Sequence, residues 1–187
     1  MDEPDVDRVF AEVDRADFLP PDRRDDAGRD EPIAIGQGQT NSQPYTVRVM
    51  LELLDVRPGQ RVLDVGSGSG WTTALLGCLV GPDGLVVGVE LEPELVRFGS
   101  GNLARYAMDW TSIRQSEDGV LGAPDLAPYD RILVSATARE LPSALVGQLA
   151  EDGVMVVPVG ADMLRAGRRE GDVDVTRHGT FSFVPLR

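Results

Sequence analysis

The residues with the clearest chemical potential are glycines and carboxylates at the ends of expected strands. The apolar run 61–65 leads into a loop with three alternating glycines: Gly66, Gly68 and Gly70. Glycine lets a backbone approach a ligand closely, and the N-terminus of a following helix favours anionic groups. The next apolar run, 85–89, ends at Glu90, whose carboxylate can accept hydrogen bonds from both hydroxyls of a ribose. Taken together, these positions predict an adenosine ligand, whereas singly they also fit a structural turn and a helix cap.

The spacing of the glycine loop separates two kinds of adenosine ligand. A dinucleotide fingerprint has glycine or alanine at its sixth position, where helix and strand pack tightly, but Trp71 stands there. The segment Val62–Gly70, with Asp64 inside it, resembles instead the first motif of S-adenosylmethionine (SAM)-dependent methyltransferases. The Asp118–Gly119 pair follows the third expected strand, where methyltransferases place an acid for the adenine amino group, although a plain turn is the alternative. Three strand ends in this order favour SAM as the cofactor over NAD.

The elements that must position these residues alternate along the chain. The apolar runs that predict strands are 61–65, 85–89, 111–115, 131–135 and 154–159. Helical spacing lies between them at 71–79, 93–107 and 142–150. This alternation predicts an α/β fold with a doubly wound, mostly parallel Rossmann-like sheet.

Flanking segments extend this expected core. A short N-terminal cap includes a helix at 6–14, and the tail indicates antiparallel strands at 172–176 and 180–184. We expect one domain over 1–187, with the cap and substrate loop in 1–46 and the Rossmann-like core in 47–187.

Composition argues against several classes of function. The chain has 187 residues and a formal net charge of −13, which would repel a phosphate backbone and disfavours a nucleic-acid partner. One cysteine and one histidine cannot supply a four-ligand zinc site, so no metal is expected. No apolar run reaches the ~18 residues of a membrane span, and the acidic first residues lack a signal-peptide pattern. The single cysteine fits a reducing compartment, so we expect a cytoplasmic protein.

Segments from both halves of the chain resemble the protein-L-isoaspartate O-methyltransferase family. Pro32–Pro44 is similar to a signature that this family carries before the SAM motif, and Asn41 stands where the family has an apolar residue. Val62–Gly70 and Glu90 match positions shared by methyltransferases generally. Further similarity covers 118–122, 127–136, 149–160 and 183–186. The resemblance implies SAM contacts from Asp64, Gly66, Gly68, Gly70, Glu90, Asp118 and Gly119.

The resemblance also implies a reaction. SAM would methylate the free α-carboxylate of an isoaspartyl residue in a damaged protein or peptide, and the ester would close to a succinimide that can reopen to aspartate. Because this acceptor is already ionised at neutral pH, no general base is required. Ser42 matches the family's active-site serine, for which we expect a positioning and hydrogen-bonding role, with a helix N-cap as the alternative. Neutral donors beside it are expected to bind the substrate: Gln39, Thr40, Asn41 and Gln43.

Three other functions stay open at this point. The first is a carboxyl methyltransferase dedicated to an aspartate of one biosynthetic peptide, which Asn41 motivates. The second is a SAM-binding module without catalysis, motivated by two glycines inside the helix at 93–107. The third is an NAD-binding oxidoreductase, which Trp71 disfavours.

Overall fold

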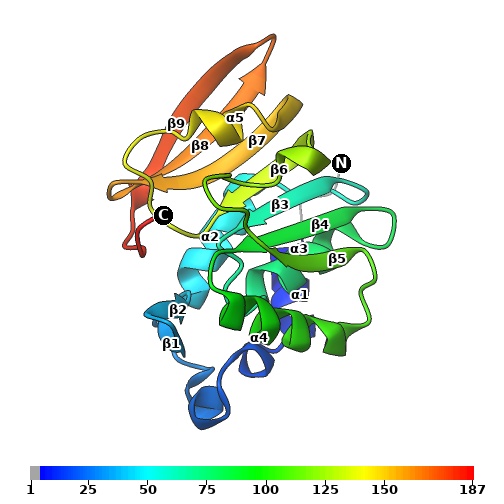
Figure 1. Ribbon diagram of the computed structural model, residues 1–187, viewed down its shortest axis with the longest axis vertical. Coiled ribbons are helices and arrows are strands. Elements are labelled where there is room, and N and C mark those ends of the chain that lie inside the picture. The colour runs from blue at the N-terminus through cyan, green and yellow to red at the C-terminus, as the bar shows by residue number, and fades with distance from the viewer. Residues whose placement is uncertain (1–4) are drawn as a thin grey trace.

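A seven-stranded sheet forms the centre of the computed structural model, which describes residues 5–187 (Figure 1). The strands lie in the order β5-β4-β3-β6-β7-β8-β9. Five of them pair in parallel: β3 (Arg61–Val65), β4 (Leu85–Glu90), β5 (Thr111–Gln115), β6 (Tyr129–Val134) and β7 (Leu149–Val159). Two antiparallel strands extend the β7 edge: β8 (Asp162–Arg169) and β9 (Asp172–Thr180). The expected α/β class, parallel core and antiparallel tail are confirmed.

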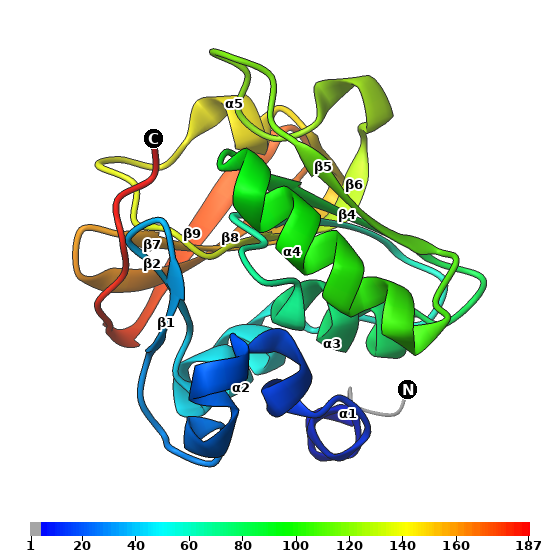
Figure 2. The ribbon, with the colours of Figure 1, turned by 60° about the horizontal axis from the view of Figure 1, so that its bottom comes forward.

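Helices cover the sheet unequally. The helices are α1 (Val6–Glu12), α2 (Pro44–Leu54), α3 (Trp71–Val80), α4 (Pro93–Leu103) and α5 (Ser143–Val146). Figure 2 shows α1, α2 and α3 on one side of the sheet and α5 on the other, and α4 packs beside α3. Within residues 5–187, no helix is both long and apolar enough to span a membrane.

The strands are apolar on both faces because both faces are covered. Val62 and Val86 belong to the cluster beneath α2 and α3, whereas Leu63 and Val87 belong to the cluster on the opposite face. Successive side chains of a strand point to opposite faces, so an unbroken apolar run is the pattern of a doubly covered parallel strand.

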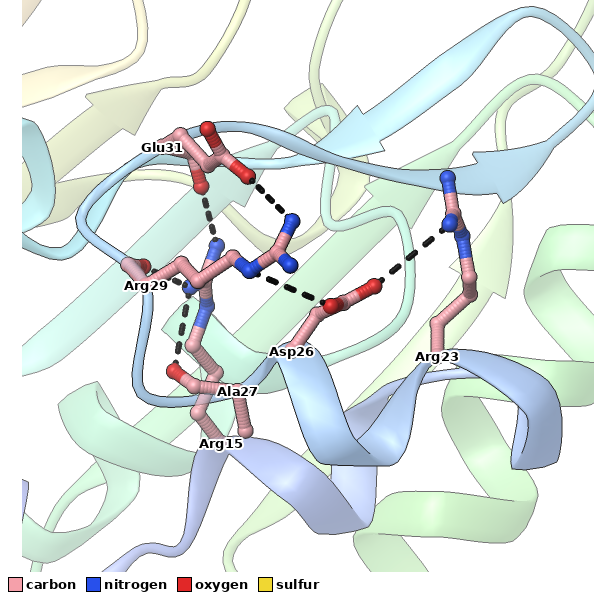
Figure 3. A network of polar contacts seen from close by, with 6 residues as sticks. All are labelled: Arg15, Arg23, Asp26, Ala27, Arg29 and Glu31. Carbon is pink, nitrogen blue, oxygen red and sulfur yellow. Dashed lines mark hydrogen bonds and ion pairs between the residues drawn. The ribbon is translucent and has the colours of Figure 1, made fainter.

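The cap packs against α2, α3 and α4 and carries a small hairpin. Short 3-10 helices at Arg15–Phe18 and Pro21–Asp26 follow α1, and β1 (Ile33–Gly36) pairs with β2 (Gln39–Asn41). Figure 3 shows the Arg15 guanidinium donating to the carbonyl oxygens of Ala27, Arg29 and Glu31. The sequence does not predict this hairpin, because the alternation of β1 spans only four residues and β2 consists of three polar residues. Residues 1–4 of the expected cap lie outside the described part of the chain.

Two sequence expectations are wrong in detail. The helix expected at 142–150 is only the single turn Ser143–Val146, because Leu149 pairs with Tyr129 and begins β7. The strand expected at 180–184 is not formed, since β9 ends at Thr180 and the chain then leaves the sheet. In both places the long-range pairing of strands decides the conformation, which local periodicity does not report.

Candidate active site

A cavity of about 480 Å³ opens at the carboxyl ends of the parallel strands. It lies where β3 and β6 pair, with the chain continuing from β3 to β4 on one side and from β6 to β7 on the other. Open α/β sheets bind ligands at such a switch point. Most residues expected from sequence line the cavity: Gln39, Thr40, Asn41, Ser42, Gly66, Gly68, Glu90, Asp118 and Gly119. The remaining ones do not line it: Gln43, Asp64 and Gly70.

The glycine loop 66–70 lies against the backbone of α4. Its three glycines have positive φ, which residues with side chains rarely adopt: Gly66, Gly68 and Gly70. A Cβ on Gly70 would lie 3.0 Å from the carbonyl oxygen of Gly99 in α4, and a Cβ on Gly99 would lie 2.8 Å from that of Gly68. Glycine at 99 therefore allows the helix and the loop to meet, although it costs an isolated helix about 1 kcal/mol relative to alanine.

Glu90 at the end of β4 is oriented by backbone amides. Its Oε2 accepts from the Gly68 amide at 2.9 Å, and its Oε1 accepts from the amides of Leu91 and Glu92 at 2.7 and 3.0 Å. A carboxylate has about four acceptor sites, so acceptor capacity is left over on a group that lines the cavity. This arrangement suits a neighbouring pair of hydroxyl groups.

Asp64 lies fully buried beneath the loop. Its Oδ2 accepts hydrogen bonds from the Thr72 and Thr73 hydroxyls at 2.8 and 2.7 Å, which ties the start of α3 to β3. Burial raises the pKa of this carboxyl from 3.8 to about 6, the two threonine hydroxyls oppose the rise, and the charge of Glu90 adds to it. Asp64 thus holds Thr72, which lines the cavity, in place.

Ser42 is available for chemistry because another residue caps its helix. The first turn of α2 has Gln43 at the N-cap position without a side-chain cap, and the Tyr45 amide donates to Asp30 Oδ1 at 2.9 Å. That bond, followed by one from Gln43, lowers the pKa of the Asp30 carboxyl. Within residues 5–187 the Ser42 hydroxyl has no hydrogen-bond partner, and Ser42 lines the cavity. The structure therefore does not support the helix-cap alternative for Ser42.

Some residues that line the cavity were not predicted from the sequence. The C-terminal segment 184–187 lines the cavity and is held by backbone bonds to Thr137, whose amide donates to Val184 and whose carbonyl accepts from Leu186. Trp71 lines it as well. The similarity at 183–186 was a signal for this segment, but nothing local placed it beside the glycine loop.

The charges around the cavity are mainly negative. Charged lining residues are the acids Glu90, Glu117 and Asp118 and the base Arg187, whose guanidinium donates to Glu92 at 2.7 Å. This balance suits a cationic ligand and opposes the two phosphates of a dinucleotide. Histidine, cysteine and lysine are absent from the cavity lining formed by the described residues, so these side chains supply no general base there.

Comparisons with known proteins agree in fold and in sequence. The family model "Protein-L-isoaspartate(D-aspartate) O-methyltransferase (PCMT)" matches residues 1–187. A protein-L-isoaspartate O-methyltransferase of Methanopyrus kandleri is 44% identical, covering 97% of this chain and 82% of the relative. One of Myxococcus xanthus is 45% identical, covering 95% of this chain and 86% of the relative.

The crystal structure of a Plasmodium falciparum protein assigned to the same activity, in complex with S-adenosyl-L-homocysteine, superimposes with a TM-score of 0.84. It is 28% identical to this chain, and the match covers 100% of this chain and 92% of the other.

Proposed function

Because the chain belongs to the protein-L-isoaspartate(D-aspartate) O-methyltransferase family, we propose that it transfers a methyl group from SAM to the free carboxylate of an isoaspartyl residue. The observation that carries this proposal is the shared cavity, which is lined both by β2 with the following Ser42 (residues 39–42, the acceptor loop) and by residues 66–69 of the glycine loop. The methyl ester would then expel methanol on closing to a succinimide, which water can reopen to aspartate. The substrates are damaged proteins or peptides.

The cavity fits SAM on three counts. Its acidic lining complements the positive sulfonium and ammonium groups of that molecule. Glu90 retains acceptor capacity for ribose hydroxyls, and Asp118, to which we assign the adenine amino group, lines the same cavity. Two buried polar atoms of lining residues, Ser67 Oγ and Trp71 Nε1, lack a hydrogen-bond partner within the described chain and can pair with a polar ligand. When bound, SAM supplies an electrophilic methyl group on its sulfonium sulfur.

The protein's own contribution is positioning. A carboxylate acceptor with an ordinary pKa is ionised at neutral pH, so a cavity without histidine or lysine suits it. We assign Ser42 the role of donating its hydroxyl to the acceptor, with Gln39, Thr40 and Asn41 beside it. Holding the carboxylate in line with the methyl group and excluding water supply the remaining rate enhancement.

The test uses two peptides that differ only in aspartate or isoaspartate at one site. With labelled SAM, base-labile methyl esters are expected on the isoaspartyl peptide alone. Esters only on the aspartyl peptide would support a dedicated peptide substrate, and SAM binding without any ester would support a binding module. Either result would overturn the proposal.

Ser42→Ala tests the role of the serine. Loss of a hydrogen bond to a charged group, about 1.5–3 kcal/mol, should slow methyl transfer about 10- to 150-fold. Ser143→Ala, on the exposed first turn of α5, makes the same chemical change away from the cavity and should leave the rate unchanged. Equal rates for the two variants would contradict the assigned role.

A further inference from the structure

The Asn41 side chain bridges two segments that are far apart in sequence. Its Oδ1 accepts from Arg15 Nε at 2.7 Å, and its Nδ2 donates to Ser69 Oγ at 3.1 Å. All three residues are buried, with 5%, 4% and 2% of Arg15, Asn41 and Ser69 exposed. A guanidinium can only donate, so the amide oxygen must face Arg15 and the amide nitrogen must face the serine. The bridge therefore has one defined orientation.

One end of the bridge is anchored on the acceptor loop. Arg15 Nη2 donates to the carbonyl oxygens of Ser42 at 2.9 Å and Asn41 at 3.4 Å. The guanidinium also donates to the three cap carbonyls drawn in Figure 3, and it lies 5.3 Å from the centre of the Trp71 ring. Burial lowers the pKa of Arg15 to about 10, so it stays protonated at neutral pH. With this many partners Arg15 cannot move without moving the backbone of Ser42.

The other end is anchored on the cofactor loop. Ser69 lies in the glycine loop and lines the cavity, and its carbonyl oxygen accepts from Asn102 Nδ2 at 3.0 Å. A ligand that contacts this loop restricts the position of Ser69. The hydrogen bond from the Asn41 amide to the Ser69 hydroxyl then connects this serine to the acceptor loop. Breaking the bridge would leave buried polar groups unpaired. Movement of one loop away from the other is therefore unfavourable.

We propose that Asn41 is a positioning residue that couples the cofactor site to the acceptor loop, so that the two substrates bind with positive cooperativity. The inference rests on the proposed function for the identity of the acceptor. The expected ordering of residues 39–42 when the cofactor binds alone does not depend on which acceptor the protein methylates. Couplings between sites are commonly about 5- to 150-fold in affinity, and they are reciprocal.

Three substitutions separate the bridge from simple packing. Asn41→Leu removes both hydrogen bonds at similar volume, and Ser69→Ala removes only the bond to the glycine loop. Asn41→Asp keeps both, because a carboxylate accepts from Arg15 and the Ser69 hydroxyl can reverse its role and donate. Asn102→Leu is the matched control, since it removes a bond to the same serine without touching the acceptor loop.

The first measurement is amide hydrogen exchange of residues 39–43 with and without S-adenosyl-L-homocysteine. Protection on addition of this ligand is expected in the wild type, Asn41→Asp and Asn102→Leu, and its loss is expected in Asn41→Leu and Ser69→Ala. Equal protection in all five proteins would overturn the inference. If Asn41→Leu does not fold, Ser69→Ala alone decides the outcome.

The second measurement is calorimetric titration of each ligand in the presence and absence of the other. In the wild type, S-adenosyl-L-homocysteine and an isoaspartyl peptide should each lower the dissociation constant of the other by the same factor. Ser69→Ala should reduce that factor towards one. A factor of one in the wild type, or an unchanged factor in Ser69→Ala, would contradict the coupling. Failure of the wild type to bind or methylate the peptide, with the exchange pattern intact, would instead overturn the proposed substrate.

Discussion

Replacing Asp64 with asparagine should change the stability of the protein, measured against wild type, more favourably at neutral pH than at acidic pH. The carboxyl is fully buried, its Oδ2 accepts from two threonine hydroxyls, and its Oδ1 has no hydrogen-bond partner within residues 5–187. Burial is the largest cause of a pKa raised from 3.8 to about 6. The folded state therefore favours the protonated form of Asp64.

The magnitude follows from linkage. A pKa shift of about 2 units at about 1.36 kcal/mol per unit corresponds to roughly 3 kcal/mol. Because the pKa is raised on folding, this stability is fully present below the unfolded pKa of 3.8 and is lost as the pH rises through about 6. Asparagine does not titrate, and its amide oxygen can still accept from Thr72 and Thr73. The free energy of unfolding of Asp64→Asn minus that of wild type should thus increase by about 3 kcal/mol between acidic and neutral pH.

Urea unfolding at constant ionic strength, followed by circular dichroism, measures this difference. Subtracting the two proteins at each pH removes the contribution of the other carboxylates, which titrate in both. Asp83→Asn, in the exposed turn before β4, changes the same group and controls for the loss of one charge. A difference for Asp64→Asn that is flat with pH, or that moves in the other direction, would refute the argument that desolvation dominates at this residue.

Three further predictions concern the loop, the ribose site and the overall charge. Gly99→Ala should weaken binding of S-adenosyl-L-homocysteine by at least about tenfold in calorimetry, because its Cβ would lie 2.8 Å from the Gly68 carbonyl oxygen. Gly101→Ala in the same helix is the control, since its Cβ meets nothing within 4 Å, and it should raise the free energy of unfolding by up to about 1 kcal/mol. Equal binding by the two variants would argue against the close approach. Glu90→Gln should weaken the same ligand about 10- to 150-fold, since a charged acceptor becomes neutral, and an unchanged dissociation constant would remove Glu90 from the site. With a net charge of −13, the melting temperature should rise between about 0.1 M and about 1 M NaCl as self-repulsion is screened, and a fall would show that attractive pairs dominate.

Local patterns in the sequence determined the core of this protein. Apolar runs of strand length, separated by helical spacing, were sufficient for the parallel sheet, because a strand buried on both faces must be apolar throughout. Glycines after the first of these strands and an acid after the second also predicted where the candidate ligand site lies, since the carboxyl ends of parallel strands meet at one edge of the sheet.

The tertiary structure decided which residues of the two ends complete that site. The Asn41 amide hydrogen-bonds the acceptor loop to Ser69, and the tail 184–187 is held at the cavity by backbone bonds to Thr137 and by the contact of Arg187 with Glu92. Glycine at position 99 lowers the intrinsic stability of its helix, but it allows that helix to contact the glycine loop. These contacts join residues tens of positions apart, and periodicity over one or two helical turns carries no information about them.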